Sequence, residues 1–201
     1  MARAQPYNRE IAIDTAQLLF WKKGYHATSM SDLQTALQMK PGSIYAAFQS
    51  KEKLFCITLE RYFFKNREEF IAGVIEAASP LDALADNLRS LGMTNQTNAA
   101  CHACMLIKTI LNATNNERAI ANRARKYLDL MEAEMAKAFG KAIALGELPA
   151  TADSKRLARR YQSDVTALRI EAHRRFNTEE LAQSAEDRAQ AYEAMRIGHT
   201  K

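Results

Sequence analysis

The amino-acid sequence predicts an all-α fold of about nine helices. Its 201 residues include only seven Gly and four Pro. Long segments rich in Ala, Leu, Glu, Lys and Arg repeat apolar residues at three- and four-residue steps, and no alternating run of β-branched residues indicates a strand. A chain of this length that is 47% hydrophobic can bury a sizeable core. We expect an N-terminal three-helix domain at residues 1–53 and a C-terminal helical domain at residues 54–201.

Positive charge is concentrated in the N-terminal part of the chain. The net charge is +5; residues 1–53 carry seven Lys or Arg against four Asp or Glu, and the remainder carries 21 against 19. This excess favours a nucleic-acid partner without establishing one. No apolar run is long enough to span a membrane, and the N-terminal MARAQPYNRE lacks the apolar core of a signal peptide. Because three Cys without such a signal also suit a reducing compartment, we expect a cytoplasmic protein with no membrane partner.

The first helix is predicted from about Asn8 to Lys23. Gly24 follows it, and glycine is typical of the position after a helix. The apolar residues that share one face of this helix are Ala12, Ile13, Ala16, Leu19 and Phe20. We expect that face to pack across the two helices that follow.

Two short helices are predicted next. Ser29 and Asp32 have the spacing of a capping box, so a helix should begin near Met30. Pro41 disfavours helical backbone in the residue before it but suits the first position of a new helix. The chain should therefore turn just before Pro41, and residues 41–48 should form the second short helix.

This pair describes a helix-turn-helix, whose second helix enters the DNA major groove. The side chains that can reach phosphates are Lys40, Ser43, Tyr45 and Lys51. Small residues at Gly42, Ala46 and Ala47 let the helix surface approach base edges. The alternative is a plain helical hairpin, in which the apolar residues are core. We adopt that interpretation for Ile44 and Phe48 only, because their i, i+4 spacing would hold the helix down.

The same stretch resembles the DNA-binding signature of the TetR family of bacterial transcriptional regulators. The matching segments are Phe20 to Tyr25, Thr28-Ser29, Gly42 to Phe48 and Ser50-Lys51-Glu52. The resemblance implies phosphate contacts from Thr28, Ser43, Tyr45 and Lys51 and base contacts at Lys40, Pro41, Gly42 and Ala46. With Ser29, these residues make up the candidate DNA-binding set.

The sequence departs from the family pattern at two places. Gln38 stands where the family usually has Gly, and a positive φ there would cost on the order of 1 kcal/mol, so we expect a slightly different turn geometry. Lys40-Pro41 replaces a more usual small polar pair, which bears on the base contacts more than on the fold.

The remaining helices are predicted from their caps and apolar spacing. A long helix should run from Ser50 to about Ala78, and Ser79-Pro80 should start another that ends at Gly92. A polar loop at 94–100 precedes a helix containing residues 101–111. The last three helices are expected to start near Asn115 or Asn116, Thr151 or Asp153, and Thr178.

Aromatic and Met residues recur in the predicted C-terminal domain. Deformable Met side chains suit an adaptable pocket, although a plain core explains them as well. The resemblance implies that a small molecule binds inside this domain. The candidate ligand-binding residues are Phe63, Met93, Cys104, Met105, Met131, Met135 and Tyr161.

Cys101 and Cys104 lie three residues apart in a predicted helix. A structural zinc site needs about four ligands, and the only other Cys is Cys56, so no metal or cofactor is expected. A thiol near a helix N-terminus can have a lowered pKa, so redox or electrophile sensing stays open beside the simpler interpretation of buried packing thiols. No strand precedes the pair as in a thioredoxin-like motif, and we expect no enzyme.

The last two helices are the candidates for a dimer interface. The residues assigned to dimerisation are Leu157, Tyr161, Val165, Leu168, Leu181, Ala185, Ala189 and Tyr192. They could pack against a two-fold copy as a four-helix bundle, or could cover the domain's own core. A pair of recognition helices reads two half-sites one turn apart, which favours the dimer.

Together these patterns predict a homodimeric transcriptional repressor with an N-terminal three-helix helix-turn-helix DNA-binding domain and a C-terminal helical ligand-binding and dimerisation domain. Its partners would be double-stranded operator DNA and a small-molecule effector that the resemblance implies. A thiol-based redox regulator and a transcriptional activator are the alternatives.

Overall fold

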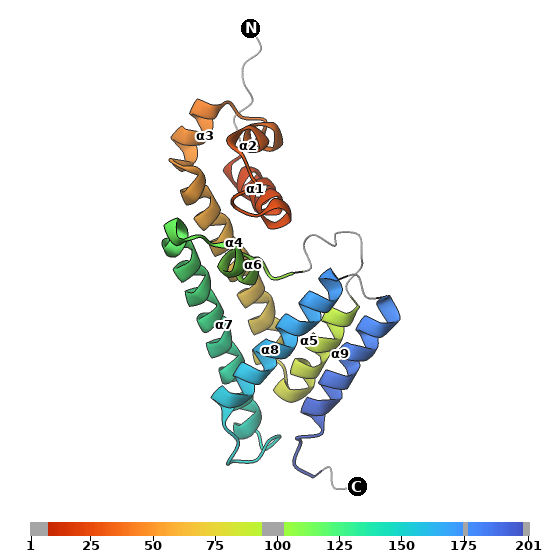
Figure 1. The fold of residues 1–201 in the computed structure, drawn as a ribbon. Helices are drawn as coiled ribbons and strands as arrows, with labels where there is room; N and C mark the ends of the chain where they lie inside the picture. Colours follow the sequence, from red (N-terminus) through yellow and green to blue (C-terminus); the bar gives the residue numbers. More distant parts are fainter. Residues whose placement is uncertain (1–7, 94–102, 175–176, 199–201) are drawn as a thin grey trace. The chain divides into compact units, whose positions relative to one another are not determined.

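The computed structural model describes residues 8–93, 103–174 and 177–198 (Figure 1). Within these residues the chain forms nine α-helices and no strand, which confirms the predicted all-α fold. The helices are α1 (Arg9–Lys23), α2 (Met30–Leu37), α3 (Pro41–Phe48), α4 (Lys51–Phe70), α5 (Pro80–Gly92), α6 (Met105–Asn112), α7 (Arg118–Ala144), α8 (Ser154–His173) and α9 (Thr178–Glu193).

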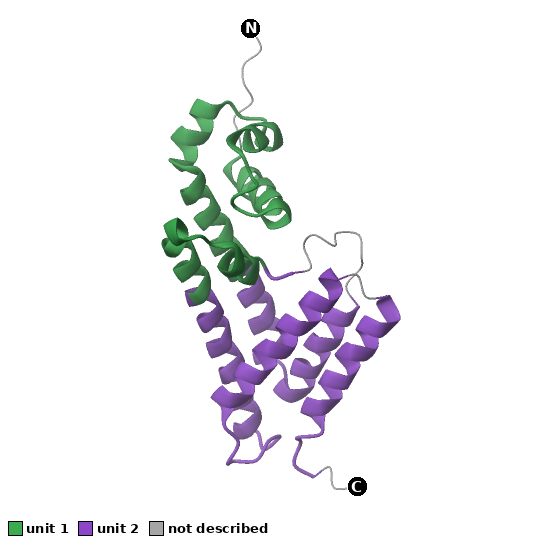
Figure 2. Cartoon of the chain, viewed as in Figure 1, with its two compact units in different colours: residues 1–64, 105–125 green, residues 65–104, 126–201 purple. Residues whose placement is uncertain are grey.

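The chain forms two compact units, and each unit consists of two separate segments of the sequence (Figure 2). The first contains residues 1–64 and 105–125, and the second contains residues 65–104 and 126–201. The expected N-terminal domain at residues 1–53 lies inside the first unit, which also takes in part of α4, α6 and the start of α7. Both α4 and α7 thus contribute residues to both units. The expected boundary concerns domains that fold separately, and it stays a prediction.

The end of α4 differs from the expected helix to about Ala78. The α-helix ends at Phe70 and continues as a π-helical turn, Ile71–Ile75, closed by the Glu76 N–H donating to the Ile71 carbonyl at 3.1 Å. Lys141 Nζ donates to the carbonyls of Ile75 and Ala77, at 2.6 and 2.9 Å. These bonds satisfy carbonyls that a continuing helix would otherwise pair, so the chain can end the helix here.

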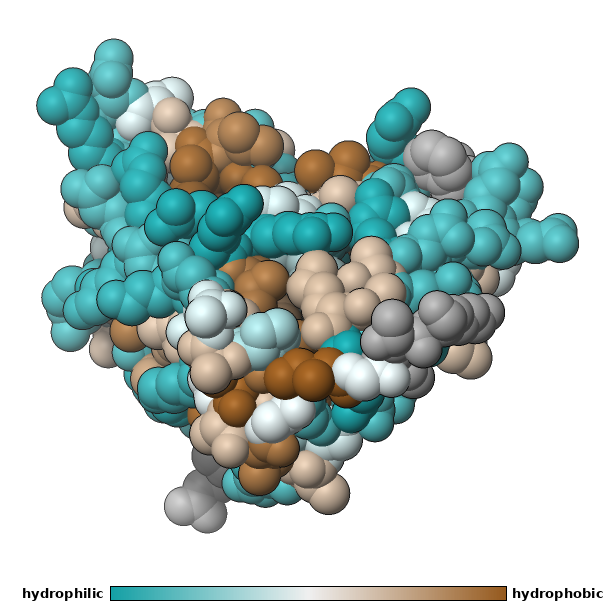
Figure 3. Space-filling view, turned by 90° about the horizontal axis from the view of Figure 1, so that it is seen from below, coloured by the Kyte–Doolittle hydropathy of each residue, from teal (hydrophilic) through white to brown (hydrophobic). Residues whose placement is uncertain are grey.

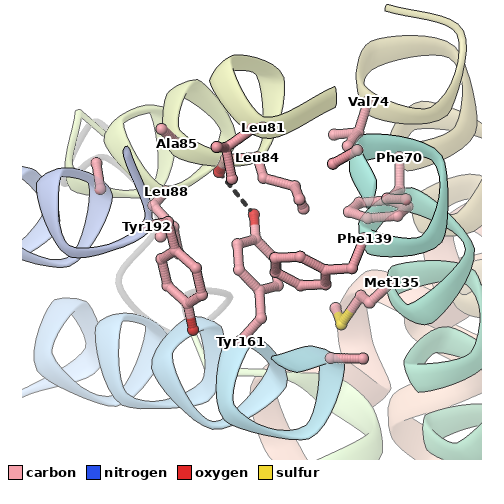
Figure 4. Packing of buried hydrophobic residues seen from close by; sticks show 14 of the residues in the cluster. Phe70, Val74, Leu81, Leu84, Ala85, Leu88, Met135, Phe139, Tyr161 and Tyr192 are labelled. Carbon is pink, nitrogen blue, oxygen red and sulfur yellow. Dashed lines mark hydrogen bonds between the residues drawn. The ribbon is translucent and has the colours of Figure 1, made fainter. Parts of the chain in front are cut away.

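Aromatic rings from three helices meet in the core of the second unit (Figure 4). The rings of Tyr161 and Tyr192 are fully buried with centroids 5.3 Å apart, and Phe139 lies 5.8 Å from each. Tyr161 donates its hydroxyl to the Leu84 carbonyl at 2.9 Å, drawn in Figure 4, and it also lies 2.8 Å from Asn87 Oδ1. Burial raises the pKa of Tyr161 well above its usual value.

Helices α5 and α9 approach each other closely at Gly92. A Cβ atom at this position would lie 2.5 Å from the Ala185 Cβ, nearer than two such atoms can pack. Glycine is therefore required by the space available, whereas its backbone angle is an ordinary one.

The residues assigned to dimerisation lie mostly inside the protomer. Six are buried in the core of the second unit, and two, Leu157 and Val165, are partly buried against it. The buried six are Tyr161, Leu168, Leu181, Ala185, Ala189 and Tyr192. The alternative interpretation, in which this stripe covers the chain's own core, accounts for their burial. A dimer contact by α8 and α9 would have to use the outer residues of these helices.

No helix in the described part of the chain is both long and apolar enough to cross a membrane. On the face that Figure 3 presents, brown hydrophobic surface is interrupted and bordered by teal hydrophilic groups.

Candidate nucleic-acid interface

Helix α2 begins at the predicted capping box. The Ser29 Oγ accepts from the Asp32 N–H at 3.0 Å, and Asp32 Oδ2 accepts from the Ser29 N–H at 2.8 Å. Lys23, at the end of α1, lies 2.7 Å from Asp32 Oδ1. The hydrogen bond from Lys23, followed by those from Ser29, holds the pKa of the Asp32 carboxyl well below its usual range. The start of α2 is thereby fixed to the end of α1.

The turn between α2 and α3 contains a left-handed residue. Gln38 has φ 53° and ψ 36°, so the different turn geometry expected from Gln at this position is not found. The next residue, Met39, is buried, and its N–H donates to the Gln34 carbonyl at 3.2 Å. Burial of Met39 and this hydrogen bond hold the turn in a conformation that costs a non-glycine residue about 1 kcal/mol.

Helix α3 is held by one face and exposes the other. Ile44 and Phe48 are each 1% exposed, whereas the Tyr45 side chain is 49% exposed. The other exposed candidates are Lys40, Pro41, Gly42, Ser43 and Ala46. A Cβ at Gly42 would meet nothing within 4 Å, so the helix surface is open at its first turn. Six of the nine DNA-binding candidates therefore share one exposed segment.

Thr28 and Lys51 are placed differently from expectation. Thr28 is buried, and its hydroxyl donates to the Gly24 carbonyl at 2.7 Å. Lys51 Nζ donates to the Thr28 carbonyl at 2.7 Å and lies 4.4 Å from the centre of the Tyr25 ring. Burial lowers the pKa of Lys51, against an opposing effect of Glu117. In the structure these two side chains stabilise the turn after α1, and their assignment to phosphate stays a prediction. The hydroxyl of the ninth candidate, Ser29, is engaged in the capping box.

Two basic residues next to α3 lie outside the candidate DNA-binding set. Arg9 lies with its guanidinium carbon 5.6 Å from the centre of the Phe48 ring. Lys53 donates to the side chain of Gln49, which follows α3 with φ 67°. Gln49 and Lys53 are four residues apart on either side of the start of α4. This spacing could have indicated from the sequence that a lysine lies beside the end of α3.

The candidate ligand-binding residues are divided between the two units. Phe63 and Met105 are buried in the first unit, whereas Met135 and Tyr161 are buried in the core of the second unit. Met131 and Cys104 are half-buried, and Met93 is 75% exposed because it follows the last turn of α5. Cys104 precedes α6 instead of lying on it, which corrects the predicted helix start, and Cys101 lies outside the described residues.

Among the described residues, no three or more His, Cys, Asp or Glu side chains are grouped so that they could hold a metal ion.

A short helix held by two buried residues, after a left-handed turn, defines a helix-turn-helix protein of the class that docks its second helix on DNA. The model of bacterial regulatory proteins of the tetR family matches residues 12–56. The HTH-type transcriptional repressor ComR of Escherichia coli (strain K12) is 29% identical over 184 residues, which cover 91% of this chain and 88% of that protein. The repressor BdcR of the same organism is 30% identical over 120 residues, 59% of this chain and 60% of that protein.

A solved structure extends the similarity over almost the whole chain. It contains a cysteine-substituted mutant of the TetR family transcriptional regulator CifR complexed with 26bp double-strand operator DNA. The TM-score is 0.85 at 26% identity, covering 94% of this chain and 99% of that one. The chain belongs to the TetR family of bacterial regulatory proteins.

Proposed function

We propose that this protein is a homodimeric transcriptional repressor that binds double-stranded operator DNA through α3 and is released by a small-molecule effector. The observation that carries the proposal is the two-sided character of α3, with Ile44 and Phe48 buried and Ser43, Tyr45 and Ala46 exposed. Exposed hydroxyls can donate to phosphates, and small residues let a helix approach base edges. The repressor ComR and the DNA complex of CifR support the same function.

Release would act through α4, which starts at Lys51, three residues after the end of α3. Because α4 contributes residues to both units, a rearrangement that an effector favours in the second unit would move α3. Operator affinity would then change with the population of that arrangement. A coupling free energy of about 1–3 kcal/mol corresponds to roughly a 5- to 150-fold change in affinity.

Dimerisation would use the outer surfaces of α8 and α9. α8 exposes basic side chains and α9 exposes acidic ones. These are Arg156, Arg159 and Arg160 on α8, and Glu179, Glu180 and Asp187 on α9. A two-fold pair in which each α8 faces the partner's α9 would bring opposite charges together.

DNA binding is tested with a pool of fragmented genomic DNA of the source organism. Fragments that the purified protein retains are labelled, and their affinity is measured by fluorescence anisotropy. We expect Ser43→Ala combined with Tyr45→Phe to weaken binding at least about tenfold, because two phosphate contacts per protomer are lost. Lys40→Ala should reduce the salt dependence of binding, whereas Lys126→Ala, an exposed lysine on α7, should not. Wild-type affinity in the first variant would refute docking through α3.

The dimer contact is tested with a charge placed on α8. Ile170 is 46% exposed on this helix, and Leu130 is 41% exposed on α7. Ile170→Glu should raise the dimer dissociation constant at least about tenfold, since it would bury a charge in the contact, and Leu130→Glu should leave it unchanged. Sedimentation velocity over a concentration series measures both. Dissociation by Leu130→Glu alone would place the contact elsewhere.

A further inference from the structure

A cavity of about 290 Å³ lies within the first unit, outside the second-unit core. Its walls come from the end of α1 and the turn that follows, from α4, from α6 and from the segment that leads into α7. This volume is at the lower end of the range for small-molecule sites, so an occupant would have one or two rings.

One wall of the cavity is aromatic and held in place by packing. Phe20 and Phe55 are buried and meet edge to face with ring centroids 5.0 Å apart, and Tyr25 lies 5.0 Å from the same Phe55 ring. Trp21 completes this wall and packs edge to face on Tyr62 at 5.0 Å. Rings already fixed by their neighbours lose little freedom when a flat molecule stacks on them.

The polar part of the lining contains more basic than acidic side chains. Lys23, Lys108 and His26 line the cavity together with a single carboxylate, Glu117. His26 Nε2 lies 2.7 Å from Glu117 Oε2, and the same oxygen accepts from the Thr114 N–H at 3.0 Å. Glu117 is therefore paired within the protein, and Lys23 is likewise paired with Asp32, so the ammonium group that an anion would meet is that of Lys108.

The same groups connect the helix-turn-helix to the segment formed by α6 and the start of α7. Lys108, on α6, donates to the Trp21 carbonyl near the end of α1 at 2.6 Å. His26 lies in the turn before α2, and Glu117 lies just before α7. An anion that takes hydrogen bonds from Lys108 or His26 would compete with both connections.

We propose that this cavity is a binding site for a small, flat aromatic carboxylate, whose ring stacks on the aromatic wall and whose carboxylate meets Lys108. Binding there loosens the connection between α6 and the helix-turn-helix and lowers affinity for DNA. The proposal that the cavity binds an aromatic carboxylate depends only on the cavity itself. The proposal that this binding lowers affinity for DNA rests on the proposed function.

Binding is measured with benzoate as the probe, through the emission of Trp21, which is the only tryptophan in the chain. Benzamide is the uncharged aromatic control, and cyclohexanecarboxylate is the non-aromatic anionic control. We expect saturable binding of benzoate, with both controls at least about tenfold weaker. No saturable change with benzoate, or equal binding of either control, would overturn the site.

Two variants locate the site in the chain. Lys108→Gln should weaken benzoate binding at least about tenfold, and Lys22→Gln, an exposed lysine on α1 that does not line the cavity, should leave it unchanged. Should Lys108→Gln fail to fold, Ala27→Phe serves instead, since Ala27 is exposed and lines the cavity. The added ring should fill the space and abolish benzoate binding. Wild-type binding by the folded variants would overturn the site.

The regulatory half is tested on the retained genomic fragments. Benzoate should lower the DNA affinity of the wild-type protein at least about fivefold and should have no such effect on Ala27→Phe. If benzoate binds and DNA affinity does not change, the regulatory half is refuted while the site stands. If no DNA is retained at all, the proposed function fails, and the Trp21 titration still decides the site.

Discussion

Helix α3 and the pair α8–α9 use an apolar stripe in different ways. In α3, two buried residues hold a short helix, and its other residues are exposed except the half-buried Ala47. In α8 and α9, most apolar residues are buried in the protomer's own core, in contact with α5 and α7, and Ile170 is an exception at 46% exposed (Figure 4). An apolar stripe therefore indicates that a helix face is buried, but not which surface buries it.

The two regions also differ in how their polar groups are satisfied. Tyr161 and Tyr192 are buried with hydroxyls bonded to partners on other helix segments, including Asp164 Oδ2 at 2.7 Å from the Tyr192 hydroxyl. By contrast, Ser43 and Tyr45 are exposed on α3. Changes in the α8–α9 region should thus act on stability, and changes on α3 should act on binding.

The largest effect is expected from Tyr161→Ala. The ring is fully buried, so its removal leaves a cavity and should lower the free energy of unfolding by about 3–5 kcal/mol. Tyr45→Ala, at a side chain 49% exposed, should lower it by less than about 1 kcal/mol. Urea unfolding followed by circular dichroism measures both. If Tyr161→Ala dissociates the dimer while the protomer keeps its full stability, Tyr161 belongs to the dimer interface and not to the core.

A second effect follows from the close approach of α5 and α9. Gly92→Ala would place a methyl group 2.5 Å from the Ala185 Cβ and should destabilise the protein by about 1–3 kcal/mol. Gly140→Ala, in α7, meets nothing within 4 Å and should stabilise it by up to about 1 kcal/mol through helix propensity. Equal shifts of the two melting temperatures would show that α5 and α9 are farther apart than described.

A smaller effect is expected at the turn before α3. Gln38→Gly should stabilise the protein by about 0.5–1 kcal/mol, because glycine adopts φ 53° without strain. The matched change Gln34→Gly lies inside α2 and should destabilise it by about 1 kcal/mol. Thermal unfolding of the two variants compares them directly. If Gln38→Gly destabilises the protein, the Gln38 side chain must contribute more free energy through its contacts than the strained backbone costs.

The smallest effect concerns an ion pair between α5 and α9. Arg89 donates to both oxygens of Glu186, at 2.7 and 3.0 Å, and this hydrogen bonding, with a smaller one from Gln190, lowers the pKa of Glu186 from 4.5 to about 2. Because the folded pKa is below the unfolded one, the contribution is full above about pH 4.5 and is lost as pH falls towards 2.

The melting-temperature difference between wild type and Glu186→Gln should therefore shrink between pH 6 and pH 2. The exposed carboxylate of Glu68, on α4, supplies the control variant Glu68→Gln. If the melting-temperature difference between wild type and Glu186→Gln stays constant across this pH range, the effect of Glu186 on stability does not come from its charge.

Much of the candidate interface could be predicted because its signals are local. The capping box at Ser29 and Asp32, the proline that opens α3 and the spacing of Ile44 and Phe48 involve only neighbouring residues. The positions of Thr28 and Lys51 could not be predicted in this way. Their hydrogen bonds join residues 4 and 23 positions apart and depend on how the turn after α1 packs.

The sequence by itself determined that the chain is helical, where most helices start, and which residues of α3 anchor it, because backbone capping and apolar periodicity act within a few residues. Only the tertiary structure decided that the stripe of α8 and α9 is core, that α6 joins the first unit, and that a cavity lies beside the helix-turn-helix. These outcomes depend on which distant surfaces pack together, and burial is a property of that packing and not of any one helix.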